Sequence, residues 1–568
     1  ETAPAVSFLF KGGHMLLGID VGGTFTDAVI IDGGTIVSSA KRRTTKENLM
    51  NGITDALGAV MNGANPAQIE QVTLSTTVVT NTIVEHKEQP VDLYVVAGPG
   101  RNVDDIFPVR PVYLKGYTDH RGIVVETTKC EDINHIAHMV QSRSGTNLAA
   151  VSAKFGVRNP KEELDIANAL GTMYDTISTG SSLSGNLNFP RRTISAYFNS
   201  AVTDVFNHFR QAVRDALAAH NITAPVYILK ADGGSLPIDT IASVPVETVF
   251  TGPAATVLGL EALRSATLGH TVALDIGGTT TDISLWKQGE PLMTKEGVSI
   301  RNYPSAVRSF AVTSVGIGGE SVVRYTDGNV TVGPEHVGPS VALGGIEPTL
   351  GDALIVLGKA HYGDEQKAYD AIVNIDSAID VKEMAMRIVD VAVQVIQDGI
   401  NEVVAKENKR PIYVVANIVH PDPFVPAQLV IVGGTAASLG PIIGDQLGLP
   451  IHIPPDAAVA NAIGAGVANH TMSITVHVDT KRRTMVVPEL GIQDKARNLR
   501  SAQVVEEIAY KLLSEAARAQ GLVPITDTPE IETISVEDFP VVDGWQSIER
   551  IITVKVQLQA GVSTYVES

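Results

Sequence analysis

Two stretches of eight residues, DVGGTFTD from Asp20 and DIGGTTTD from Asp275, carry a carboxylate, two glycines and two threonines at identical spacing. A Gly-Gly turn lets backbone amides point at one spot, since no Cβ stands in the way, and such a nest of amides binds anions. Thr24 and Thr279 add hydroxyl donors. Each leading aspartate is an oxygen ligand of the kind that Mg²⁺ prefers, often through water. Two such turns facing each other would hold a nucleotide triphosphate from both sides.

These turns differ from the familiar phosphate-binding loops. Neither contains G-x-x-x-x-G-K-[ST] or G-x-G-x-x-G, so P-loop and dinucleotide-binding classes lose support. Asp27 and Asp282 end the two stretches, and two roles stay open for them, orientation of the turn and direct participation in catalysis. A single D-x-G-G-T stretch is also compatible with an ordinary tight hairpin. The occurrence of two matched copies favours a functional device.

The flanks of the two stretches match as well. Each copy follows one apolar run and precedes a second run, a turn and a third run, which predicts two β-hairpins or meanders. Helical patterns at 46–62 and 195–220 alternate with short strands between the copies, and a long amphipathic pattern covers 382–407. This alternation predicts an α/β fold that contains a duplicated domain.

The length of 568 residues exceeds what a single core supports, so several domains are expected. We predict an N-terminal half at 15–195, a second half at 196–470 and a smaller α+β region at 471–568. The first fourteen residues lack the charged start of a signal peptide and are interpreted as a leader before a native start at Met15.

Composition narrows the partners and the compartment. The formal net charge of −19 argues against nucleic acid, and no run approaches the roughly 20 apolar residues of a membrane helix. The single cysteine, Cys130, excludes an internal disulfide and a cysteine-cluster metal site. The sequence therefore predicts a cytoplasmic protein that binds neither nucleic acid nor membrane. Assembly with further copies of the chain stays open.

A third glycine-rich segment, LVIVGGTAASLG at 429–440, predicts a strand, a Gly433-Gly434 pair and a helix that begins at Thr435. Glycines at this place would let the adenosine of a nucleotide lie against the backbone, although an ordinary strand-to-helix turn has the same pattern.

Taken together, the motifs DVGGTFTDAV, STTVVTNTIVEH, TGPAATVLG, LDIGGTTTDISL and VGIGGES resemble the hydantoinase A and 5-oxoprolinase family. This family lies within the superfamily of actin, sugar kinases and heat-shock chaperone ATPases. The resemblance covers about residues 15–470. It implies duplicated actin-like (ribonuclease H-like) ATPase domains with a nucleotide cleft between them, followed by the small α+β region.

The resemblance also implies an activity. An ATP-dependent hydrolase subunit of this type phosphorylates a cyclic amide, such as a hydantoin, 5-oxoproline or a related lactam, and so activates the ring for opening by water. A separate B-type subunit commonly completes the reaction, and the chain itself has no G-x-S-x-G elbow and no His/Cys/Asp metal spacing. The expected cofactors are ATP and Mg²⁺.

Site residues carried over by position fall into three groups. The implied catalytic residues are Asp20, Asp275, Thr24 and Thr279, with Asp20 and Asp275 also holding Mg²⁺ through water. The implied nucleotide-binding residues are Gly22, Gly23, Gly277, Gly278, Gly318, Gly319, Gly433, Gly434 and Thr435. The implied substrate residues are Thr76, Thr77 and Asn81, for which helix N-cap chemistry is an equal alternative. His86 is interpreted as a cap or surface residue, with general-base catalysis as the alternative.

The chain departs from the family pattern at Glu320, which follows Gly318 and Gly319 where a third glycine is usual. Two competing functions therefore stay in view. One is an ATP-dependent ketone carboxylase subunit, and the other is an actin-like or chaperone-like ATPase without a small-molecule substrate.

Overall fold

The computed structural model describes residues 15–44, 49–100, 104–265, 269–294, 296–410, 422–495, 499–524, 527–543 and 546–567. The predicted leader before Met15 lies outside these residues. No helix in the described ranges is long and apolar enough to cross a membrane.

The first sheet has the strand order β12-β11-β4-β1-β2-β3. Its strands are β1 (Met15–Val21), β2 (Phe25–Asp32), β3 (Thr35–Arg43), β4 (Ile69–Thr76), β11 (Val226–Leu229) and β12 (Ser235–Pro237). β1, β2 and β3 form the predicted antiparallel meander, whereas β4 and β11 run parallel to β1. β1 is almost wholly buried, as expected for a central strand covered on both faces.

The second sheet repeats this arrangement with the order β15-β14-β13-β21-β22. Its strands are β13 (His270–Ile276), β14 (Thr281–Lys287), β15 (Glu290–Pro291), β21 (Gln428–Val432) and β22 (Ile451–His452), with β18 (Val312–Val315) also paired to β14. β13 pairs antiparallel with β14 and parallel with β21, just as β1 pairs with β2 and β4. The predicted α/β fold with a duplicated sheet arrangement is thereby confirmed.

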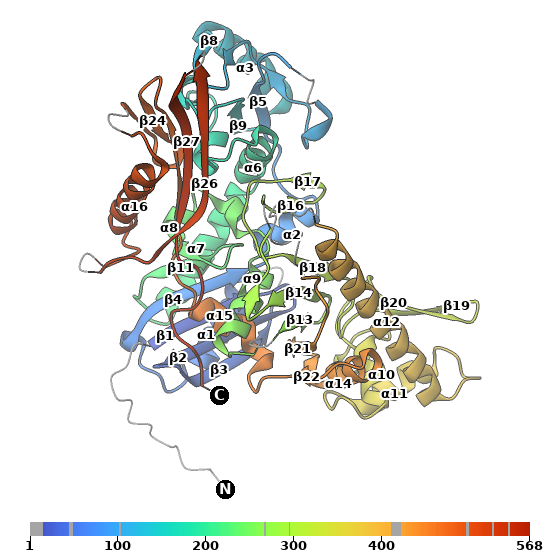
Figure 1. Cartoon of the computed structure of the whole chain (residues 1–568). Coiled ribbons are helices and arrows are strands. Elements are labelled where there is room, and N and C mark those ends of the chain that lie inside the picture. Colours follow the sequence, from blue (N-terminus) through green and yellow to red (C-terminus); the bar gives the residue numbers. More distant parts are fainter. Residues whose placement is uncertain are drawn as a thin grey trace.

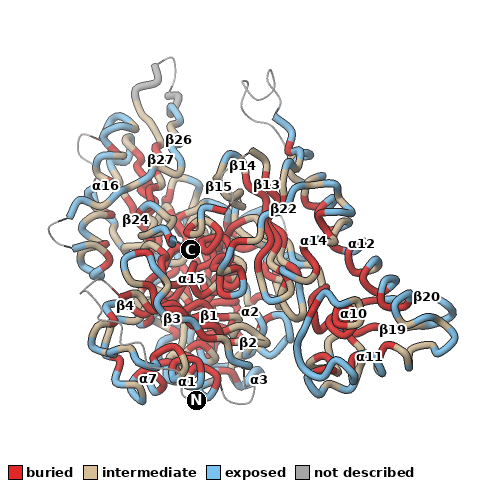
Figure 2. Tube along the Cα trace, turned by 90° about the horizontal axis from the view of Figure 1, so that it is seen from below, coloured by how far each residue is buried: buried red, intermediate tan, exposed pale blue. Residues whose placement is uncertain are grey.

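Two helices of small residues pack between the sheets, α9 (Thr251–Ala262) and α15 (Ala460–Gly466). A Cβ added at Gly259 would lie 2.1 Å from the carbonyl oxygen of Ala460, and one at Gly464 would lie 2.0 Å from that of Ala255. Only glycine permits backbones to approach so closely. Figure 2 shows α15 surrounded by buried chain at the centre of the molecule.

A smaller parallel sheet is inserted after β4, in the upper part of Figure 1, with the order β10-β9-β5-β6. Its strands and covering helices are β5 (Asp92–Val96), β6 (Val112–Tyr113), β9 (Leu148–Ala153), β10 (Thr176–Thr179), α3 (Cys130–Ser144) and α4 (Lys161–Leu170). The chain then returns through α6 (Phe189–Ala201) and α7 (Thr203–Ala219). The helix predicted at 195–220 is therefore two helices, since α6 ends before Val202.

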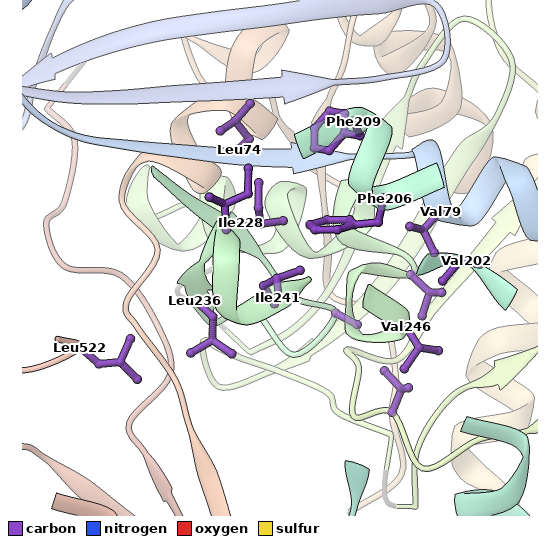
Figure 3. Close-up of a cluster of buried hydrophobic side chains, with 14 of the residues drawn as sticks. Leu74, Val79, Val202, Phe206, Phe209, Ile228, Leu236, Ile241, Val246 and Leu522 are labelled. Atoms are coloured by element: carbon purple, nitrogen blue, oxygen red, sulfur yellow. The ribbon is translucent and has the colours of Figure 1, made fainter. Parts of the chain in front are cut away.

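Aromatic residues of α7 fix the returning chain on the first sheet. Figure 3 shows Phe206 and Phe209 beside Leu74 of β4 and Ile228 of β11, and all four belong to one buried cluster. This packing holds the carboxyl end of β4. Ser75, near that end, and the residues that follow it enter the site described below.

Helices α10 (Leu350–Val356), α11 (Glu365–Val373) and α12 (Val381–Asn408) extend to one side of the second sheet, together with the hairpin β19–β20. α14 (Ala436–Leu447) follows β21. The hairpin consists of β19 (Val323–Thr326) and β20 (Asn329–Val332).

The C-terminal region forms a five-stranded sheet on the opposite side, with the order β25-β24-β23-β27-β26 and one long helix. Its elements are β23 (Ser473–Asp479), β24 (Thr484–Val487), β25 (Ile492–Lys495), α16 (Ala502–Ala519), β26 (Ile531–Asp543) and β27 (Gln546–Leu558). Its buried residues join the same core as those of the first sheet. The α+β character predicted from residue 471 onward agrees with these elements.

Strand pairing puts β11 and β12 in the first sheet, although they follow the predicted boundary between residues 195 and 196. The sequence pattern missed this because the inserted sheet separates β11 from its neighbour β4 along the chain. We therefore propose a boundary in the segment that leads into α9.

Candidate functional site

The two Gly-Gly turns meet in one cleft with a volume of about 160 Å³. Its lining from the turns and their strands is Asp20, Gly22, Gly23, Thr24, Phe25, Asp27, Asp275, Gly277, Gly278, Thr279, Thr280 and Asp282. The rest of the lining is Lys41, Thr77, Gly252, Pro253, Gly433, Gly434, Ala457, Ala458 and Asn461. Segments more than 400 residues apart, such as those at Asp20 and Asn461, thus share one site.

Strand register places two carboxylates side by side in each hairpin. Asp20 of β1 is opposite Asp27 of β2, and Asp275 of β13 is opposite Asp282 of β14. Directly opposed residues in an antiparallel pair have side chains on the same face of the sheet. Both aspartates of each DxGGTxTD stretch therefore face the cleft.

The same backbone hydrogen bond closes each of the two turns. The amide of Gly22 donates to the carbonyl of Phe25 at 3.0 Å, and that of Gly277 donates to Thr280 at 3.0 Å. Because these two amides are consumed within the turns, the amides that follow them are the ones left to meet a ligand in the cleft.

Asn461 joins the two hairpins. Its amide nitrogen donates to Asp275 Oδ2 at 3.2 Å and to Asp20 Oδ2 at 3.4 Å. The hydroxyl of Thr256 on α9 lies 2.6 Å from Asp275 Oδ2 and 2.8 Å from Asn461 Oδ1. The sequence analysis missed both residues. Asn461 is the one polar side chain within ANAIGAG of α15, and that pattern is the signal that could have identified it.

Burial and mutual repulsion weaken the acidity of these carboxyl groups. Burial, supported by the nearby charge of Asp275, raises the pKa of Asp20 although Ser75 donates a hydrogen bond to it. Burial also raises the pKa of Asp27 and that of Asp282 to about 7. The carboxyl groups of Asp27 and Asp282 therefore ionise near neutral pH.

Lys41 distinguishes the first hairpin from the second. It lies opposite Asp27 in the register of β2 and β3, and its ammonium donates to Asp27 Oδ2 at 2.7 Å. The same ammonium donates to the carbonyl of Ala458 at 3.1 Å. In the second hairpin Ser314 is opposite Asp282 and donates a hydrogen bond to it. Asp27 of the first hairpin is thus paired with a cation, whereas Asp282 of the second hairpin accepts from a hydroxyl.

The predicted adenosine segment lies at the end of the second sheet. Gly433 has φ +96°, and a Cβ there would lie 2.4 Å from Asp275 Oδ1. Gly434 has open space around it and also lines the cleft. Thr435 instead supports the turn from behind, with its hydroxyl 3.2 Å from the carbonyl oxygen of Gly277.

Gly318 and Gly319 lie against the second turn rather than in the cleft lining. A Cβ at Gly318 would be 2.5 Å from the carbonyl carbon of Gly278, and the amide of Gly319 donates to Gly277 at 3.0 Å. They shape the turn, and direct contact with a nucleotide stays a prediction for them.

Glu320, which stands in place of a third glycine, connects the halves. Arg43 of β3 donates to its Oε1 at 3.0 Å, and Nε2 of His336 lies 2.9 Å from its Oε2. The carboxylate of Glu320 is buried. Its ion pair with Arg43 connects a strand of the first sheet to the segment that packs against the second turn.

Of the three residues predicted to contact substrate, one lines the cleft and two do not. Thr76 is buried and its backbone carbonyl accepts a 2.6 Å hydrogen bond from Thr251. Thr77 lines the cleft at the start of α2 (Val78–Val84), and Asn81 donates to its hydroxyl at 3.2 Å. His86 is exposed at the far end of α2, in agreement with a surface position.

The carboxylates that line the cleft are candidate ligands of a divalent cation. Asp27 Oδ1 is buried and has no hydrogen-bond partner among the described residues. The described residues hold no group of three or more His, Cys, Asp or Glu able to bind a metal by themselves. Mg²⁺ is commonly held by one or two carboxylates, with water and substrate phosphates completing its shell. The cleft fits such a cation.

Comparisons with known proteins agree with this arrangement. Residues 192–474 match a family model described as hydantoinase/oxoprolinase, and residues 16–174 match that of the hydantoinase/oxoprolinase N-terminal region. The acetophenone carboxylase gamma subunit of Aromatoleum aromaticum is 25% identical over an alignment of 576 positions, which covers 89% of this chain and 74% of the relative. Caprolactamase subunit alpha of Pseudomonas jessenii is 25% identical over an alignment of 383 positions, which covers 60% of this chain. The match spans only 54% of that relative's length.

Two solved structures share the fold over 97% of this chain and 88% of their own. The nucleotide-free structure of acetone carboxylase has a TM-score of 0.72 at 16% identity. The ATP-dependent caprolactamase of P. jessenii has a TM-score of 0.69 at 20% identity.

Proposed function

Because the chain belongs to the hydantoinase/oxoprolinase family, we propose that it is an ATP-dependent cyclic amide hydrolase subunit. It would phosphorylate the amide oxygen of a hydantoin, 5-oxoproline or a related lactam. The observation that carries this proposal is the cleft in which Asn461 connects the aspartates of two Gly-Gly turns. Amide groups, hydroxyls and carboxylates converge there from both halves, as a triphosphate with its cation requires.

The binding roles follow from which groups the fold leaves available. We assign the phosphate contacts to the amides that follow the turn-closing glycines and to the hydroxyls of Thr24 and Thr279. Asp20 and Asp275 would hold Mg²⁺, which when bound neutralises charge on the transferring phosphoryl group. The glycines at 433 and 434 would support the adenosine.

The amide oxygen forms a bond to the γ-phosphorus, the bond from that phosphorus to the bridging oxygen breaks, and ADP leaves. The amide nitrogen loses its proton, which leaves a cyclic imidate phosphate. Water then attacks the ring carbon, and the ring C–N bond breaks as the nitrogen takes up protons again, which leaves an acyl phosphate. A second water hydrolyses this acyl phosphate to the free carboxylate and phosphate. Asp282 lines the cleft with a pKa of about 7, so we assign it the base that receives the nitrogen's proton.

We further propose that a B-type subunit completes the ring opening. The name of the caprolactamase relative identifies it as a subunit alpha, which supports a divided enzyme. The subunit proposal predicts that the purified chain releases ADP but opens the ring slowly until its partner is added. Full hydrolysis by the isolated chain would contradict it.

A ketone carboxylase subunit is the second candidate. It is favoured by the acetophenone carboxylase relative, whose match covers 89% of this chain, a larger share than the caprolactamase match. ATP would then activate the ketone oxygen instead of an amide oxygen, and bicarbonate would be needed for turnover.

The test is ADP release with Mg-ATP across hydantoins, 5-oxoproline, larger lactams and small ketones, each with and without bicarbonate. Stimulation by a cyclic amide that disappears in Asp20→Asn and Asp275→Asn supports the hydrolase. Asp165 of α4 lies outside the cleft lining and pairs with Lys161, so Asp165→Asn is the matched control. Bicarbonate-dependent stimulation by a ketone would transfer support to the carboxylase. ADP release that no compound stimulates would contradict both the hydrolase and the carboxylase.

A further inference from the structure

A second cavity of about 320 Å³ lies apart from the nucleotide cleft. Four parts of the chain enclose it: the segment at 182–184, the segment after β11, the segment at 306–308 and the C-terminal region. None of its lining residues lines the cleft between the turns. Its volume falls within the range of small-molecule sites, about 300 to 1,000 Å³.

Six charged side chains line this cavity: Lys230, Asp232, Glu247, Arg308, Glu489 and Lys555. Lys230 and Asp232 are among the buried residues, and Lys230 Nζ lies 3.2 Å from Asp232 Oδ2 and 3.5 Å from Glu247 Oε2. Charged groups this deep are rare unless they are paired. Lys230 is therefore already neutralised by its neighbours.

Arg308 and Lys555 are different. Neither has a carboxylate within 4 Å in the part of the chain that the structure describes, although Arg308 donates a hydrogen bond to the side chain of Gln557. Burial and the charge of Arg308 lower the pKa of Lys555. Glu489 does not compensate directly, because its oxygens accept from Gly185 and from the backbone and hydroxyl of Thr475. Two cations therefore line the cavity without a carboxylate in direct contact, although Glu489, Glu247 and Asp232 attract Lys555 from farther away.

One lining residue of the cavity, Thr471, carries an unpartnered hydroxyl. Thr471 is fully buried, lines the cavity, and its Oγ1 has no hydrogen-bond partner among the described residues. A buried hydroxyl without a partner is destabilising, so natural proteins usually retain one only where something else satisfies it.

We propose that this cavity binds a small molecule that carries a carboxylate, with Arg308 and Lys555 as its counter-ions and the Thr471 hydroxyl as a further hydrogen-bond partner. The carboxyl groups of Asp232, Glu247 and Glu489 match the three cations of the lining in number, so a ligand with more than one negative charge would be repelled. For this reason the site favours a single carboxylate over a doubly charged phosphate.

The site is connected to the nucleotide cleft along the chain. Glu247 lines the cavity, and five residues later Gly252 lines the cleft at the start of α9. A ligand that contacts Glu247 would thus act on the segment that carries one wall of the nucleotide site.

The experiment is calorimetric titration of the full chain, without nucleotide, by small monocarboxylates and by their uncharged carboxamides. Cyclopentanecarboxylate, benzoate and 5-oxoproline serve as probes, and inorganic phosphate is a third arm. We expect at least one carboxylate to bind, with its carboxamide weaker by roughly tenfold or more, as befits the loss of a charged hydrogen bond. Binding without nucleotide keeps this outcome independent of the proposed ATP chemistry.

Two variants assign the binding to the cavity. Lys555→Met should weaken carboxylate binding by roughly tenfold, whereas Lys511→Met, at an exposed lysine of α16, should leave it unchanged. Thr471→Val should weaken binding while leaving the unfolding midpoint unchanged or higher, since it removes a hydroxyl that has no partner in the free chain. A purely structural role would lower that midpoint and leave affinity unaltered.

Equal binding of carboxylate and carboxamide, or unaltered affinity in Lys555→Met, would overturn the proposal. So would tighter Lys555-dependent binding of phosphate than of every carboxylate, or no binding by any probe.

Discussion

Replacing Asp27 by asparagine should change how the stability of the protein depends on pH. Asp27 is 6% exposed, and its pKa is about 7 against the ordinary 3.8, since burial outweighs the attraction of Lys41. The folded protein therefore retains a proton that the unfolded chain has already released. Stability from this proton is complete below about pH 4 and is lost as the pH rises through about 7. Asparagine cannot ionise, so Asp27→Asn removes this loss.

The size of the effect follows from the shift. A displacement of about three units, at 1.36 kcal/mol for each, corresponds to about 4 kcal/mol in the free energy of unfolding. The difference in this free energy between Asp27→Asn and the parent protein should therefore grow by about 4 kcal/mol between about pH 4 and about pH 8. Ionisation of the other cleft carboxyls occurs in both proteins and largely cancels in the difference.

The assay is urea unfolding followed by circular dichroism over that pH range. Asp32→Asn, at the opposite end of β2, is the matched control and should run parallel to the parent protein. Parallel curves for Asp27→Asn and the parent would refute the reasoning, because they would mean that the Asp27 carboxyl has the same proton affinity in both states.

Three further changes test the cleft. Lys41→Met removes the cation that holds down the pKa of Asp27, so the pH at which this carboxyl ionises should rise by about one to two units, measured as the shift of its ¹³C carboxyl NMR signal. An unmoved titration would show that Lys41 does not act on it. Gly433→Ala places a Cβ in contact with a hairpin carboxylate at a positive φ and should lower the unfolding midpoint and abolish binding of a fluorescent ATP analogue, whereas Gly434→Ala should fold normally. Equal behaviour of the two alanine variants would contradict the geometry. Asp282→Asn should reduce substrate-stimulated ADP release by about 10²- to 10⁴-fold and remove the limb of the pH–rate profile near pH 7, and a retained limb would exclude it as the base.

Much of the fold could be predicted because its signals are local. Strand periodicity and Gly-Gly turn chemistry involve only neighbouring residues, so each DxGGTxTD stretch and its flanking strands were found correctly. The division between the halves stays a prediction. β11 pairs with β4 although the inserted sheet lies between Thr76 and Val226 along the chain, and no local pattern indicates such a pairing.

The sequence by itself determined the duplication, the two carboxylate-bearing turns and the membership of the family, because these rest on short motifs repeated at fixed spacing. Only the tertiary structure decided which side chains complete the site. Lys41 acquires its role through strand register, and Asn461 reaches Asp20 across 441 residues of chain. The carboxylate-binding cavity likewise exists only because Lys555 is carried by a C-terminal strand to the segment after β11. Such positions depend on how distant elements pack, and packing is a property of the whole folded chain.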